Sequence, residues 1–139
     1  QLTNQPVDLK IEEWIYNEYP GLRAYQKLSF KSQLDEALGG LNEKIRPITP
    51  SKVYEASHSM NYAYFNVLSE KTNFELGPAY CDFEFEDKGK FLIEVMDKYK
   101  NNFDGDLKRI NEWASILRLS SWYEWKNFEE VPSNYEYMI

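Results

Sequence analysis

The sequence holds one histidine and one cysteine, which limits the chemistry that its side chains can perform. A nucleophilic site of the serine or cysteine type would need His58 as its general base. Cys81 is followed by Asp82, Glu84 and Glu86, whose negative charges disfavour the reactive thiolate. We therefore expect no cysteine catalysis and interpret Cys81 as a buried residue on the inner side of a strand.

Glu55 and His58 are three residues apart on a predicted helix, a spacing typical of the Glu-x-x-His motif of di-iron bundles. Those sites use two such motifs and two further glutamates, and no second histidine exists here. A mononuclear site completed by other carboxylates stays open as an alternative. The expected role of His58 is that of a packed or partly exposed structural residue, and neither a metal nor a cofactor is predicted.

Neighbouring carboxylates are frequent in this acidic sequence, at 12–13, 84–86, 104–106 and 129–130. Glycoside hydrolysis needs two carboxylates at a fixed separation across a sugar, and proximity in sequence does not define that separation. Carbohydrate binding, with or without hydrolysis, therefore stays open, because tryptophans can stack on sugars. The run 104–106 lacks the spaced ligands of a calcium loop, and no phosphate-binding glycine motif is present.

Aromatic and acidic residues are interleaved in two segments, 80–86 and 122–137. Aromatic anchors ringed by acids suit the recognition of a basic protein. The competing interpretation places the tryptophans in the core and the tyrosines over it. We predict a contact surface that draws on both segments: Tyr80, Asp82, Glu84, Glu86, Trp122, Trp125, Glu129, Glu130, Tyr135 and Tyr137.

The net charge of the sequence indicates which classes of partner it can attract. With 23 acidic against 16 basic residues, the formal charge is −7, which repels nucleic-acid phosphates and anionic membranes and attracts a basic protein. The same charge also serves simply to keep a protein soluble. No apolar run approaches the roughly 20 residues that cross a bilayer.

The number of cysteines indicates the cellular compartment in which the protein is expected. A single cysteine excludes an intrachain disulfide and favours a reducing environment, so a cytoplasmic location is expected. The chain begins at Gln1 and not at Met, which also fits processing or excision from a longer protein.

Apolar residues at helical spacing predict helices over 8–19, 22–45, 50–68, 90–102 and 106–117, and a short one from 121 to 128. Predicted caps are Asp8, Thr49, Asp106 and Ser121. The glycines at 39–40 either end the second helix or let another backbone approach. Two adjacent apolar stripes over 53–68 predict that the third helix is central.

Residues 81–95 fit two patterns. Cys81, Phe83 and Phe85 alternate with acids, as in a strand, and 87–89 could turn it into a hairpin. Six apolar residues at helical spacing over 91–103 outweigh that alternation, so we predict a helix for 90–102. A short strand or hairpin near 80–86 stays open.

These elements predict a mainly α fold, a single-domain bundle of five or six helices over 1–139 with irregular ends at 1–7 and 132–139. With no convincing catalytic apparatus, the predicted function is non-enzymatic protein binding. An acidic inhibitor or immunity-type protein that neutralises a basic partner fits best. The rivals are an acidic mimic of DNA, a carbohydrate-binding or carboxylate-based hydrolytic domain, and an accessory domain of a larger chain.

Overall fold

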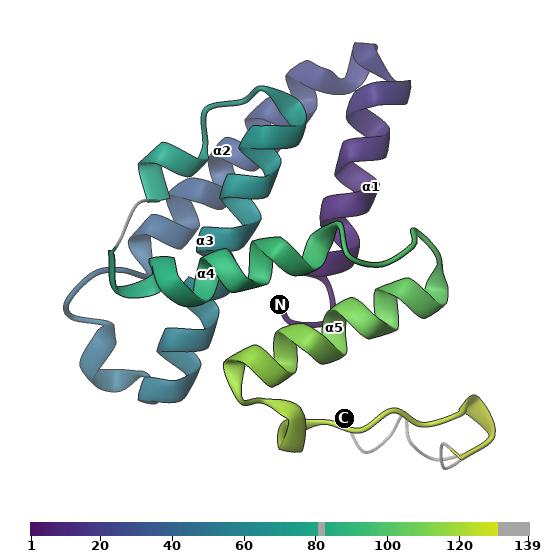
Figure 1. Cartoon of the computed structure of the whole chain (residues 1–139). Helices are drawn as coiled ribbons and strands as arrows, with labels where there is room; N and C mark the ends of the chain where they lie inside the picture. The colour runs from purple at the N-terminus through teal and green to yellow at the C-terminus, as the bar shows by residue number, and fades with distance from the viewer. Residues whose placement is uncertain (81–82, 131–139) are drawn as a thin grey trace.

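A computed structural model describes residues 1–80 and 83–130, and this part of the chain folds as a mainly α-helical bundle (Figure 1). Its α-helices are α1 (Gln5–Glu18), α2 (Arg23–Gly39), α3 (Ser51–Thr72), α4 (Phe83–Met96) and α5 (Phe103–Leu117). Short 3-10 helices accompany them: η1 (Pro20–Leu22), η2 (Arg46–Ile48), η3 (Gly77–Tyr80), η4 (Ser120–Trp122) and η5 (Phe128–Glu130). The predicted fold class is confirmed, and no strand occurs among the described residues.

Helix α3 is the central element, as its two apolar stripes predicted. It packs against α1, α2, α4 and η3, and α5 packs in turn on α4. Figure 1 shows α4 lying across α3, with α5 below α4. Both stripes are buried along most of their length: Tyr54, His58, Tyr62 and Phe65 on one, and Ala56, Met60, Ala63, Tyr64, Val67 and Leu68 on the other.

The first and third helices begin at other residues than predicted. Helix α1 starts at Gln5 rather than Asp8, because a proline in the first turn loses no helical hydrogen bond. Part of the stretch predicted as irregular is therefore helical. Thr49 does not cap α3, since its hydroxyl donates to the Ile45 carbonyl at 2.9 Å instead.

The hairpin left open as an alternative does not occur in the described residues after 82. The helix predicted for 90–102 forms as α4, which begins earlier, at Phe83, and ends earlier, at Met96. Phe85 of the alternation at 83–86 enters the core, and its side chain continues the buried helical face formed by Leu92 and Val95. Glu84 and Glu86 fall in the first turn, where negative charge favours a helix. Cys81 and Asp82 lie outside the described residues.

Helix α2 ends at Gly39, so the glycine pair terminates the predicted 22–45 helix. Gly40 also brings its backbone close to His58, since a Cβ there would lie 3.3 Å from the His58 Cε1 atom. Among the described residues, no helix has the length and apolar character that crossing a bilayer requires.

The last helix begins earlier than predicted, at Phe103, and ends at Leu117 as predicted. Asn102, not Asp106, caps α5, and its Oδ1 accepts from the Gly105 N–H at 2.7 Å. Arg118 ends the helix in the left-handed conformation, with a φ of 58°. The short helix predicted from Ser121 is replaced by η4 and then by extended backbone at Tyr123.

Candidate functional site

His58 is a packed core residue. Its side chain is 5% exposed, its Nδ1 atom shares a hydrogen bond with the Tyr80 hydroxyl, and the Tyr54 ring lies 4.3 Å away. Glu55 of the same helix faces outward and forms an ion pair with Lys88. The Glu-x-x-His pair therefore does not form one site, and no group of three metal-ligating side chains occurs in the part of the chain described here.

Tyr80 does not belong to a contact surface, which corrects its assignment. Only 1% of the residue is exposed, and its ring packs 5.7 Å from Phe65. A buried phenol needs a hydrogen-bond partner, and His58 provides one. Tyr80 thus holds η3 against α3.

Glu84 and Glu86 lie on the outer side of α4, but each already has a basic partner. The Arg46 guanidinium forms two hydrogen bonds with Glu84, and this interaction lowers the pKa of that carboxyl group. Glu86 pairs with Lys90 one turn later, at 2.7 Å. Two of the predicted contact carboxylates are therefore compensated within the chain.

Trp122 and Trp125 reach the surface, with 55% and 48% of each residue exposed. The Asn111 Oδ1 atom of α5 accepts two hydrogen bonds, from the Tyr123 hydroxyl and from Trp125 Nε1, both at 2.7 Å. The Tyr123 and Trp125 rings meet edge to face, 5.7 Å apart. We call Trp122, Tyr123 and Trp125 the aromatic shelf, in which the two tryptophans are exposed and Tyr123 is partly buried against the core.

Two further predicted residues, Glu129 and Glu130, are exposed in η5. The Glu130 carboxylate accepts from the Asn127 backbone N–H, and neither glutamate forms an ion pair with any described residue. Asp82, Tyr135 and Tyr137 lie outside the described residues.

Described residues of both predicted segments, Phe85 and Trp122, lie near the beginning of α3, where the Phe85 ring is 5.9 Å from the Tyr54 ring. Lys52, in its first turn, places its ammonium 5.3 Å from the centre of the Trp122 ring. One turn later, Glu55 pairs with Lys88 of α4. The aromatic shelf and the first half of α4 therefore flank the beginning of the central helix.

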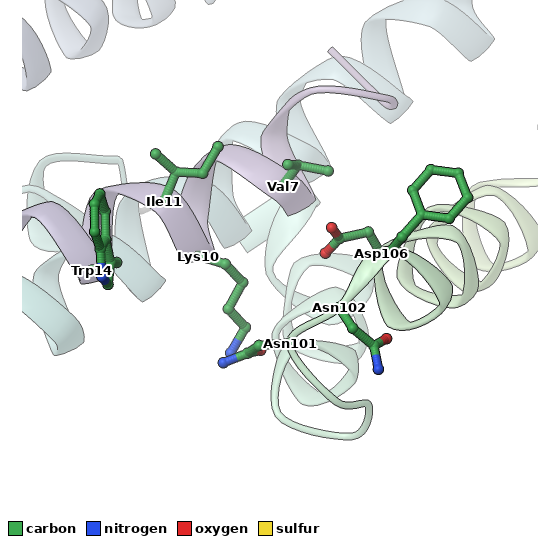
Figure 2. A pocket seen from close by; sticks show the side chains of 8 residues that line it. Val7, Lys10, Ile11, Trp14, Asn101, Asn102 and Asp106 are labelled. Atoms are coloured by element: carbon green, nitrogen blue, oxygen red, sulfur yellow. The ribbon is translucent and has the colours of Figure 1, made fainter.

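A groove that the sequence did not predict lies between α1 and the start of α5 (Figure 2). The helical pattern of α1 suggested an inner face, yet Ile11 and Trp14 of that pattern are 46% and 55% exposed. Pro6 and Leu9, on another side of α1, are the buried residues of this helix, and Leu9 belongs to the hydrophobic core. The groove has a volume of about 400 Å³ and is lined by Val7, Lys10, Ile11, Trp14, Asn101, Asn102, Phe103 and Asp106.

Arg109 supports the α5 side of this groove and was also missed. It is fully buried, and its guanidinium donates to the carbonyls of Met96 and Tyr99 and to the side chains of Asn101 and Asp106. Nothing in the sequence indicated this burial, because Arg109 lies outside the apolar set of its helix; once buried, an arginine needs several acceptors.

Comparison with known proteins gives no relative: no protein-family model, no curated protein and no solved structure matches this chain.

Proposed function

We propose that this chain is a non-enzymatic protein-binding domain, an acidic inhibitor of the immunity type that neutralises a basic partner. The observation that carries the proposal is the aromatic shelf. Exposed tryptophans are uncommon on a surface without a partner, and they dominate the energetics of many protein interfaces. Here the rings of Tyr123 and Trp125 are held by hydrogen bonds to one Asn111 oxygen, so these side chains lose little conformational freedom on binding.

The charge around the shelf supports a basic partner. Glu129 and Glu130 follow the shelf in sequence and have no ion-pair partner among the described residues, in contrast to Glu84 and Glu86. The formal charge of −7 adds a long-range attraction that speeds the encounter with a basic protein. Lys52 beside Trp122 indicates that this ring already accepts an ammonium group at its surface.

The test is affinity capture from the native cell extract at low and moderate salt, followed by identification of the bound proteins. The comparison uses the unmodified chain, a shelf variant carrying Trp122→Ala and Trp125→Ala, and a Trp14→Ala control. Trp14 is as exposed as Trp122 but belongs to α1. Circular dichroism verifies that all three chains are folded.

The expected result is one dominant basic protein that binds the unmodified chain and the Trp14 control and is lost from the shelf variant. Its retention should fall as salt rises, because charge attraction is screened. Capture of no dominant protein, or equal capture by the shelf variant, would refute the assignment.

A further inference from the structure

The groove between α1 and α5 combines an apolar wall with polar groups on the opposite side. Figure 2 shows Val7, Ile11 and Trp14 along α1, with Asn101, Asn102 and Asp106 on the facing segment. Its volume of about 400 Å³ lies in the range of roughly 300–1,000 Å³ that is usual for small-molecule sites. An apolar wall with a few directed polar groups is the usual composition of such a site.

The polar side of the groove is held in a fixed arrangement by Arg109. One guanidinium nitrogen donates to the Asn101 Oδ1 atom at 3.0 Å, and another donates to the Asp106 Oδ1 atom at 3.1 Å. These bonds orient the Asn101 amide, whose NH₂ group has no hydrogen-bond partner among the described residues, as a donor. The second carboxylate oxygen of Asp106 remains as an acceptor.

The aromatic wall is also held in place. The Trp14 ring packs edge to face on Tyr19, with 5.3 Å between ring centroids. The groove therefore offers a fixed, exposed aromatic surface beside a fixed donor and a fixed acceptor. Little ordering would be needed when a ligand binds.

The groove carries no net charge, although the whole chain is acidic. Lys10 pairs with Asp97 at 3.2 Å, and Asp106 pairs with Arg109. A strongly charged ligand of either sign would be repelled by the like-charged member of one of these pairs. The arrangement suits a neutral molecule that has an apolar face and a rim of groups that both donate and accept hydrogen bonds.

We propose that this groove binds a neutral sugar, whose C–H face stacks on Trp14 while its hydroxyl groups contact Asn101 and Asp106. A pyranose ring has the required combination of one apolar face and a polar edge. Hydrolysis is not part of the proposal. Glycosidases use two carboxylates across the sugar, and Asp106 is the one carboxylate among the described residues that line this groove.

This site is separate from the aromatic shelf. The groove lies at the start of α5 and the shelf follows its end, and a helix of 15 residues spans about 20 Å. A variant at one site can therefore serve as the control for the other.

The experiment is ligand-observed saturation-transfer NMR on the full chain. The probes are glucose, galactose, mannose, N-acetylglucosamine and their disaccharides at millimolar concentration. At least one sugar should receive saturation. Its dissociation constant should rise about tenfold in Trp14→Ala, which removes the stacking surface, and less in Trp14→Phe, which keeps a smaller ring.

Trp122→Ala is the matched control, because it removes an equally exposed tryptophan outside the groove. Its sugar affinity should equal that of the unmodified chain. Absence of saturation transfer to every sugar, or equal binding by Trp14→Ala, overturns the proposal. If an extended peptide binds the groove instead, Trp14→Ala will weaken peptide binding while the sugars show no signal, and this outcome also rejects the sugar site.

Discussion

At the scale of single residues, Arg109 shows how one buried cation can organise a loop. Its guanidinium satisfies the Met96 carbonyl at the end of α4 and the Tyr99 carbonyl in the loop that follows. Main-chain carbonyls at a helix end have no partner within the helix, and leaving them buried without one costs free energy. The same side chain orients Asn101 and Asp106, so the shape of the groove depends on it.

Replacing Arg109 by leucine should lower the free energy of unfolding by about 3 kcal/mol, because the buried acceptors lose their donor and Asp106 loses its counter-charge. Urea unfolding followed by circular dichroism measures this change. The control is Lys108→Ala, which removes a neighbouring exposed cation paired with exposed Asp104 and should change stability little. Equal effects of the two substitutions would contradict the bridging role of Arg109.

Asp97 should make part of the stability dependent on pH. Hydrogen bonding and charge attraction from Lys10, with a further contribution from Lys71, lower the pKa of this carboxyl group below its usual 3.8. A lowered pKa in the folded state means that the stabilisation is present above 3.8 and is lost as the pH falls through the folded-state value. Asp97 is largely exposed, so the effect should be small.

The variant Asp97→Asn should therefore lower the melting temperature slightly at neutral pH and match the unmodified chain at about pH 2. Thermal unfolding across this pH range measures the difference. Glu94→Gln provides the comparison, because Glu94 is exposed in the last turn of α4, three residues before Asp97, and has no ion pair among the described residues. If the melting temperatures of Asp97→Asn and the unmodified chain differ by the same amount at every pH, the ion pairs of Asp97 do not contribute to stability.

At the scale of elements, the sequence predicted the helices whose buried faces are continuous. The two stripes of α3 and the inner face of α5, which includes Trp113 and Leu117, are buried as expected. The start of α4 was missed because Phe83 and Phe85 are two residues apart, a spacing that a strand also produces. For these residues, the packing of α4 across α3 favours a helix over a strand.

The candidate site was harder to predict than the helices. The apolar set of α1 has helical spacing, but spacing does not reveal which side of a helix meets the core. Ile11 and Trp14 remain exposed because Leu9 is the α1 side chain that enters the core. Likewise, alternating acids and aromatics in 80–86 gave no sign that Tyr80 turns inward or that Arg46 neutralises Glu84.

The crossing of α4 over α3 gives a prediction for this pair of helices. Gly89 lies against the Tyr62 ring, and a Cβ atom at this position would be 2.2 Å from Tyr62 Cδ1. Gly89→Ala should lower the free energy of unfolding by about 1–3 kcal/mol, since overpacking at a buried ring outweighs the gain in helix propensity.

Gly39→Ala at the end of α2 is the matched control, because a Cβ atom at this position would have no neighbouring atom within 4 Å. The same substitution there should leave stability unchanged or raise it by up to about 1 kcal/mol. Chemical unfolding of both variants provides the comparison. A stabilised Gly89→Ala variant would mean that α4 does not pack closely on Tyr62.

At the scale of the whole molecule, the formal charge of −7 and the local acids of η5 make different contributions to binding. Net charge acts at long range and speeds the encounter with a basic partner. Carboxylates within the interface form contacts that slow dissociation. Variants of equal net charge separate the two effects.

Two double variants are compared. The first carries Glu129→Lys and Glu130→Lys, and the second carries Glu70→Lys and Glu75→Lys. Each Glu-to-Lys change adds two charges, so both variants move the formal charge from −7 to −3. Glu70 is exposed near the end of α3, and that helix of 22 residues spans about 30 Å from the Lys52 end beside the shelf.

Association and dissociation rates with the captured basic partner should be measured at low salt and at about 0.1 M salt, where charges are screened beyond roughly 10 Å. At low salt both variants should associate more slowly than the unmodified chain, because both lose the same long-range attraction. At the higher salt only the 129–130 variant should dissociate faster, since it alone has lost contacts within the interface. Equal dissociation rates of the two variants would place the interface away from η5 and leave net charge as the only acidic contribution to binding.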